Sequence, residues 1–190
     1  MRAAWQVMVA VVVKPERLVF VDECGTHTSL APIYGYAPRG ERLRLSVPRK
    51  RGKNTTLLSS MTLSGMGPSL AVEGSTTARV FETYVEKVLA PSLEGGQIVV
   101  MDNLGAHRPK RVRELVEARG CELLYLPSYS PDYNPIEEAF AKIKNLPRKA
   151  AARSKEALVD AIGVALSAVT ADDIRGFFEN AGYHPTGHLL

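Results

Sequence analysis

The amino-acid sequence predicts an α/β fold with a mixed five-stranded sheet, in which three antiparallel strands precede two parallel ones and helices flank the sheet. Residues 17–24 and 97–101 each contain a continuous apolar run, which is typical of strands that a parallel sheet buries on both faces. Between these runs, short apolar or β-branched pieces alternate with turn residues, and this pattern indicates antiparallel pairing. The expected pieces lie at 33–37, 42–47, 55–63 and 69–73.

The second half of the chain alternates between helix and strand. Apolar residues at a spacing of 3.6 predict a helix at 76–89, with Ser75 or Thr76 as its N-cap. The elements expected after it are a strand at 97–101, a helix at 108–119 closed by Gly120, a strand at 122–126, a helix from 135 onwards, and helices at 154–169 and 170–180. Pro147 should interrupt and kink the helix that begins at 135. This order of elements resembles that of ribonuclease H-like folds.

The two ends of the chain are expected to lie outside a single domain at 15–183. Residues 1–14 form an N-terminal extension, in which the β-branched valines favour an edge strand over the tail of a helix. Its apolar run is much shorter than the about 20 residues of a membrane-spanning helix, and no cleavage site of a signal peptide closes it. Residues 184–190 are expected to be a loose tail.

Composition narrows the class of protein. The 45% hydrophobic and 23% charged fractions exclude disordered and fibrous classes, and a length of 190 residues suits one domain. The formal charge of +4 favours a polyanionic partner. Cys24 and Cys121 are far apart and indicate neither a zinc site nor a disulfide framework, which fits a reducing cytoplasm.

Two aspartates follow the apolar runs and are the first candidates for a functional site. Asp22 lies at the far end of the first strand, and Asp102 directly follows the strand at 97–101. If these strands are neighbours, the two carboxylates meet, and they repel each other unless a cation lies between them. The pair therefore predicts a metal site, although each aspartate taken alone could simply begin a turn.

A third carboxylate, Glu137, has two interpretations. With Asn134 as N-cap and Pro135 at the first helical position, Glu137 occupies the place of a capping-box glutamate. The alternative is that Glu137 joins the two aspartates as a metal ligand. Glu138 lies about 100° further round the helix and should point elsewhere.

Three motifs together resemble the catalytic domain of DDE transposases of the IS630/Tc1/mariner superfamily, most closely the bacterial IS630 group. They are VDE at 21–23, MDNLGAH at 101–107 and YSPDYNPIEEAFAKIK at 129–144, and 34 residues separate Asp102 from Glu137, as in the D-D-34-E arrangement of that superfamily. The likeness extends from residue 2 to residue 183. Cys24 stands where a threonine is expected, and the chain lacks the helix-turn-helix region that precedes this domain in the family.

The resemblance implies a metal-dependent DNA enzyme with Asp22, Asp102 and Glu137 as catalytic residues. They would hold two Mg²⁺ or Mn²⁺ ions, with Asp22 bridging both, and Asn103 and His107 would lie near the site. The implied reaction is phosphodiester cleavage at element ends, followed by transfer of the 3′-hydroxyl into a TA-containing target. The implied setting is a homodimer assembled on DNA in the bacterial cytoplasm, associated with the nucleoid and not with a membrane, with the helix-turn-helix region encoded upstream or lost.

A basic segment between the expected strands is the candidate DNA-binding surface. Such a run can be a solvated face, but beside a metal-binding carboxylate pair it favours contacts to phosphates, which give affinity without sequence information. Its basic residues are Arg39, Arg42, Arg44, Arg49, Lys50, Arg51 and Lys53.

Two other functions remain open at the level of sequence. The chain could be a truncated or frameshift-separated product that binds DNA or full-length transposase without cutting. It could also be a ribonuclease H-like nuclease with another substrate, because one fold hosts many functions. An overlapping upstream reading frame for helix-turn-helix domains would favour the transposase.

Overall fold

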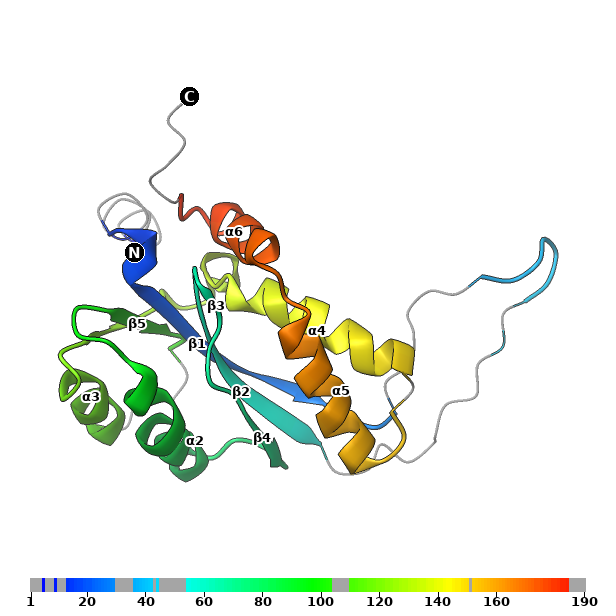
Figure 1. Cartoon of the computed structure of the whole chain (residues 1–190), viewed down its shortest axis with the longest axis horizontal. Coiled ribbons are helices and arrows are strands. Elements are labelled where there is room, and N and C mark those ends of the chain that lie inside the picture. The colour runs from blue at the N-terminus through cyan, green and yellow to red at the C-terminus, as the bar shows by residue number, and fades with distance from the viewer. Residues whose placement is uncertain are drawn as a thin grey trace.

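The structure is a computed structural model that describes Trp5, Val9 and residues 13–29, 36–42, 44, 54–103, 110–150 and 152–184. A central mixed sheet is covered by helices on both faces (Figure 1). Its strands are β1 (Leu18–Thr26), β2 (Thr55–Thr62), β3 (Gly65–Met66), β4 (Leu70–Glu73), β5 (Ile98–Met101) and β6 (Glu122–Tyr125). The predicted combination of antiparallel strands followed by parallel ones is confirmed.

The strand order is β3-β2-β1-β5-β6, and β4 also pairs with β2. β1 is antiparallel to β2 and parallel to β5, and β5 is parallel to β6. β4 pairs with residues 55–58 of β2 and β3 with residues 61–62, both antiparallel. Since β1 occupies the other edge of β2, β3 and β4 follow one another along a single edge. The sheet thus has six strands where the sequence predicts five, because β3 and β4 share one edge of β2.

The predicted strands at 33–37 and 42–47 are not found where the structure describes these segments. Residues 36–42 and 44 belong to no strand, and a turn forms in which the Glu41 amide donates to the Pro38 carbonyl at 3.0 Å. Gly40 has a φ of 90° in this turn, a conformation that favours glycine. Figure 1 shows residues 36–42 apart from the sheet. Residues 30–35 and 45–53 lie outside the described part of the chain.

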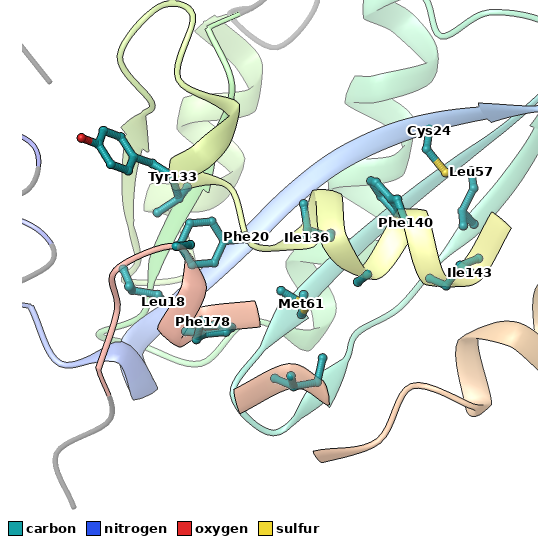
Figure 2. Packing of buried hydrophobic residues seen from close by; sticks show 14 of the residues in the cluster. Leu18, Phe20, Cys24, Leu57, Met61, Tyr133, Ile136, Phe140, Ile143 and Phe178 are labelled. Atoms are coloured by element: carbon teal, nitrogen blue, oxygen red, sulfur yellow. The ribbon is translucent and has the colours of Figure 1, made fainter. Parts of the chain in front are cut away.

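One face of the sheet is covered by the three C-terminal helices, α4 (Ile136–Ala150), α5 (Lys155–Ser167) and α6 (Ala171–Asn180). Leu18, Phe20 and Cys24 of β1 pack there against Phe140 of α4 and Phe178 of α6 (Figure 2). Because side chains alternate along a strand, every second residue of β1 faces this layer. This alternation determines the side of the sheet on which Asp22 lies.

The other face is covered by α2 (Ala78–Tyr84), its π-helical and 3₁₀ continuations (Val85–Leu89 and Ala90–Ser92), and α3 (Lys110–Glu117). Val19 and Val21 of β1 pack there with Phe81 of α2 and Val112 of α3. The predicted helix at 76–89 is therefore present, but its N-cap is Thr77, whose hydroxyl accepts from the Val80 amide. Ser154 and Thr170 cap α5 and α6 in the same way.

Helix α4 does not stop at Pro147, so the predicted interruption is wrong. The helix continues to Ala150 with Pro147 inside it. Pro147 is buried, and together with Cys24, Thr26 and Ile162 it lines a small void between α4, β1 and α5. The ring thus contributes to the apolar core, and this burial compensates for the backbone hydrogen bond that a proline cannot make.

The N-terminal segment is helical rather than extended at Trp5 and Val9, the two residues described within 1–12. They are four positions apart, on one helical face, and both join the core. The Trp5 indole donates to the Tyr183 hydroxyl at 3.0 Å, and that hydroxyl donates to the Tyr133 carbonyl at 2.8 Å. The edge-strand interpretation is therefore wrong there. Tyr183 is fully buried, and residues 185–190 of the expected tail lie outside the described residues.

A search of the described helices for a long apolar segment that could cross a membrane finds none.

Candidate active site

Asp22 and Asp102 come directly after the last residue pair of the parallel ladder between β1 and β5. That pair is Val21 with Met101, so the next position on each chain is an aspartate. The sequence predicts Asp22 at the end of its strand, but β1 continues to Thr26 in its pairing with β2. Only the pairing of β1 with β5 ends directly before Asp22. By strand alternation, Asp22 lies on the same face as Phe20 and Cys24, the face that α4 covers.

Glu137 lies in the first turn of α4 and faces the same cavity as the two aspartates. This cavity has a volume of about 350 Å³, and it is lined by Asp22, Asp102, Asn103, Leu126, Pro127, Ser128, Tyr129, Ser130, Pro131, Asn134 and Glu137. The three carboxylates come from β1, the end of β5 and the start of α4. The structure therefore brings together three acidic residues that are far apart in the sequence.

The Asp22 carboxylate is buried, with an exposed fraction of 5%. Its Oδ1 accepts a hydrogen bond from the Glu23 amide at 2.7 Å, and its Oδ2 accepts one from Asn134 Nδ2 at 2.6 Å. A buried carboxylate needs such donors in place of water. Two donors acting on different oxygens also restrict rotation of the carboxylate.

Asn134 is a site residue that the sequence interpretation assigned to another role. Its side chain does not cap α4, since its Oδ1 accepts no hydrogen bond from the described residues, and the Glu137 amide donates to the Asn134 backbone carbonyl at 3.1 Å. The Asn134 amide in turn donates to the Pro131 carbonyl at 2.9 Å. Neither half of a capping box between Asn134 and Glu137 is therefore formed. The interpretation of Glu137 as a capping-box residue therefore loses its main support.

Glu138 points away from the cavity, as the helix geometry predicts. Its Oε2 accepts a hydrogen bond from Asn180 Nδ2 of α6 at 3.1 Å. Adjacent glutamates on one helix are thus directed to different places. This divergence makes Glu138 a natural control for Glu137.

Asn103 lines the cavity next to Asp102. Its Nδ2 donates to Ser128 Oγ at 3.4 Å, while its buried Oδ1 has no hydrogen-bond partner within the described ranges. His107, the second expected near-site residue, lies at 104–109, outside the described residues. Of the expected DNA-binding residues, Arg39, Arg42 and Arg44 are exposed and do not line the cavity, whereas 49, 50, 51 and 53 lie outside the described part.

Tyr129 is a residue at the cavity that the sequence analysis did not single out. Its side chain is 97% exposed, and its φ of 57° is in the left-handed region, which is uncommon for a bulky residue. Backbone strain of this kind concentrates at functional sites. In the sequence, Tyr129 begins the motif at 129–144 and lies between two prolines of the cavity wall, Pro127 and Pro131.

Cys24 follows Asp22 by two residues on the same face of β1. Burial raises the pKa of its thiol to about 12, and the nearby Lys144 ammonium offsets only part of this effect. The thiol is therefore protonated at neutral pH and is a poor nucleophile. The chemistry of this cavity must come from its oxygen groups.

These oxygen groups match the ligands that Mg²⁺ and Mn²⁺ prefer. Three carboxylates and two carboxamides line the cavity, and the Oδ1 atoms of Asn103 and Asn134 are buried without a partner in the part of the chain that the structure describes. Within the same residues, no three acidic, histidine or cysteine side chains are gathered closely enough to hold a metal ion. The donor chemistry of the residues that line the cavity fits divalent cations.

The fold is that of a ribonuclease H-like domain, and three acidic residues line its main cavity. The chain belongs to the family of DDE superfamily endonucleases, because the model of that family matches residues 17–159.

Solved structures of the Mos1 mariner transposase are similar to this chain. The catalytic domain of Mos1 is 20% identical with a TM-score of 0.60, and the match covers 87% of this chain and 78% of that one. Mos1 in a pre-cleavage transpososome is 19% identical with a TM-score of 0.71, over 87% of this chain and 53% of that one. The chain thus spans about half the length of that protein. A search of curated proteins finds no match. The ribonuclease H-like fold predicted from the order of elements is confirmed by the likeness to the Mos1 catalytic domain.

Proposed function

We propose that this chain is the catalytic domain of an IS630-like DNA transposase, which cuts phosphodiester bonds at element ends and transfers the 3′-hydroxyl into target DNA. The observation that carries the proposal is the convergence of Asp22, Asp102 and Glu137 on one cavity. The match to DDE superfamily endonucleases and the likeness to Mos1 support it. Residues 15–183 form the catalytic unit in this proposal, with 1–14 as an extension and 184–190 as a tail.

The three carboxylates are the proposed ligands of two Mg²⁺ or Mn²⁺ ions, and solved Mos1 complexes include one with Mn and one with Mg. Bound metal supplies activation of the attacking water or 3′-hydroxyl and stabilisation of the leaving oxygen. The chain itself contributes the orientation of these groups. The Glu23 amide and the Asn134 side chain hold the Asp22 carboxylate in place, and no side-chain nucleophile is required.

DNA is the proposed partner, bound through its phosphates. The net charge of +4 and the exposed Arg39, Arg42 and Arg44 support an electrostatic mode of binding, to which 49, 50, 51 and 53 would add. Mos1 has been solved in a paired-end complex with its left transposon end. The resemblance to the IS630 group supports the further proposal that this domain acts as a homodimer on element ends and on a TA-containing target, in the bacterial cytoplasm at the nucleoid.

A nicking assay tests the proposal. Supercoiled plasmid is incubated with the purified chain and Mg²⁺ or Mn²⁺, and nicked product is quantified beside a gel shift for DNA binding. Asp22→Asn and Asp102→Asn should abolish nicking and leave the gel shift unchanged, because the arginines rather than the carboxylates supply affinity. Undiminished nicking by either variant would contradict the metal-dependent mechanism.

A further inference from the structure

Asn134 links two of the elements that carry the acidic residues of the cavity. It lies directly before α4, three residues from Glu137, and its side chain reaches Asp22 of β1, 112 positions away in the sequence. The donor–acceptor distance of 2.6 Å is short for an N–H···O bond, as is usual when the acceptor is charged. Asn134 is 4% exposed and contributes to the cavity wall.

The hydrogen bonds of Asn134 do not follow the pattern of a residue that serves stability. An N-cap asparagine turns its side-chain oxygen to the amides of the first helical turn. Asn134 instead directs Nδ2 to Asp22 Oδ2, and its Oδ1 is buried with no partner among the residues that the structure describes. Such an unsatisfied buried acceptor lowers the stability of the fold. A local departure from the stabilising arrangement is typical of functional sites.

We propose that Asn134 is a positioning residue for the metal-binding carboxylate of Asp22, an inference that rests on the function proposed above. With the Glu23 amide on Oδ1 and Asn134 on Oδ2, the carboxylate is held in one orientation. The same bond ties β1 to the start of α4, so it also controls the approach of Glu137 to Asp22. Outer groups of this kind typically change metal affinity or activity by about 10- to 100-fold when removed.

Direct measurement of Mn²⁺ binding to the metal-free protein tests this role. Asn134→Ala should bind Mn²⁺ about 10- to 100-fold more weakly than the wild type, as followed by electron paramagnetic resonance of the free ion, and its nicking should fall through kcat rather than KM. Its melting temperature should fall only moderately, because removal of the unsatisfied Oδ1 offsets part of the cost of losing one donor to the Asp22 carboxylate.

A second variant, Asn134→Asp, replaces the donor with a carboxylate beside Asp22. Repulsion between the two should lower the melting temperature in metal-free buffer, and Mn²⁺ should raise it by more than in the wild type, because a cation relieves the repulsion. The matched control is Asn180→Ala, which removes an amide-to-carboxylate bond to Glu138 outside the cavity. This control should leave Mn²⁺ affinity unchanged.

The outcomes separate this inference from the proposed function. The positioning role is overturned if Asn134→Ala binds Mn²⁺ and nicks DNA as well as the wild type does. It is also overturned if Mn²⁺ raises the melting temperature of Asn134→Asp by no more than that of the wild type. The proposed function fails instead if the wild type binds Mn²⁺ no better than Asp22→Asn. If Asp22→Asn loses Mn²⁺ binding while both Asn134 variants retain it, only the role of Asn134 is wrong.

Discussion

Val21 of β1 lies opposite Met101 of β5 in the last pair of their parallel ladder, and an aspartate follows each of them. Neighbouring strands in a sheet run about 4.8 Å apart, so the pairing of the two backbones places Asp22 and Asp102 side by side, where the ladder between β1 and β5 ends. Their proximity depends on main-chain pairing, not on flexible loops. The third carboxylate, Glu137, is brought to them by the packing of α4 on the same face.

Glu137 and Glu138 offer a test of the proposed metal site. Glu137→Gln should melt close to the wild type, since no capping box with Asn134 is present to be lost, and it should fail in an Mn²⁺-supported strand-joining assay. Glu138→Gln should keep most of its activity, because this side chain contacts Asn180 outside the cavity. Full activity of Glu137→Gln together with loss of activity in Glu138→Gln would refute the assignment.

The exposed arginines Arg39, Arg42 and Arg44 should determine the salt dependence of DNA binding. Replacing all three with alanine should flatten the slope of log affinity against log salt by about 0.9 for each phosphate that the protein no longer neutralises. A fluorescence anisotropy titration over a range of salt concentrations measures this slope. The matched control replaces Lys110, Arg111 and Arg113 of α3, which are paired with glutamates. An equal change in both triple variants would contradict a specific role for the loop arginines.

Phe140 should be a principal contributor to the stability of α4. It is fully buried in the cluster between α4 and the sheet, so Phe140→Ala should lower the free energy of unfolding by about 3–5 kcal/mol. Val164 of α5 is 60% exposed, and Val164→Ala should change it by less than about 0.5 kcal/mol. Equilibrium unfolding in urea compares the two variants. Similar losses in both would mean that the packing of α4 is misassigned.

The Asp173 carboxylate should stabilise the fold at neutral pH, and this contribution should be lost at low pH. Its hydrogen bond from Lys142 and two further bonds from Thr170 lower the pKa of the carboxyl from 3.8 to about 2. A pKa lowered by folding adds stability above the unfolded value of 3.8, and this is lost as the pH falls through 2. The difference in melting temperature between the wild type and Asp173→Asn should therefore shrink as the pH falls over this interval. A difference in melting temperature that does not change with pH would contradict this account.

Much of the fold could be predicted from sequence because its strongest patterns are local. The apolar runs of β1 and β5 and the periodicity of the later helices each reflect burial of one continuous segment. The convergence of Asp22, Asp102 and Glu137 on one cavity agrees with the order of strands and the family spacing. Their roles as metal ligands stay a prediction.

The missed features depend on contacts between distant parts of the chain. The partner of the Asn134 side chain is 112 residues away, so local rules gave it the role of an N-cap. The valines before residue 14 favour a strand by propensity, yet Trp5 is helical and bonded to Tyr183. Pro147 remains in α4 because its ring is buried against β1 and α5. The rule that proline breaks a helix does not include the stability gained from this burial.

Strand β1 belongs to both hydrophobic clusters at once. Phe20 and Cys24 pack with α4 and α6 on one face, and Val19 and Val21 pack with α2 and α3 on the other. Neither helical layer can separate from the sheet without exposing part of the strand that holds Asp22. The domain should thus behave as one cooperative unit, in which hydrogen exchange at the amides of β1 requires global unfolding. The cavity therefore cannot persist in a partly unfolded form, and any loss of the fold is also a loss of the site.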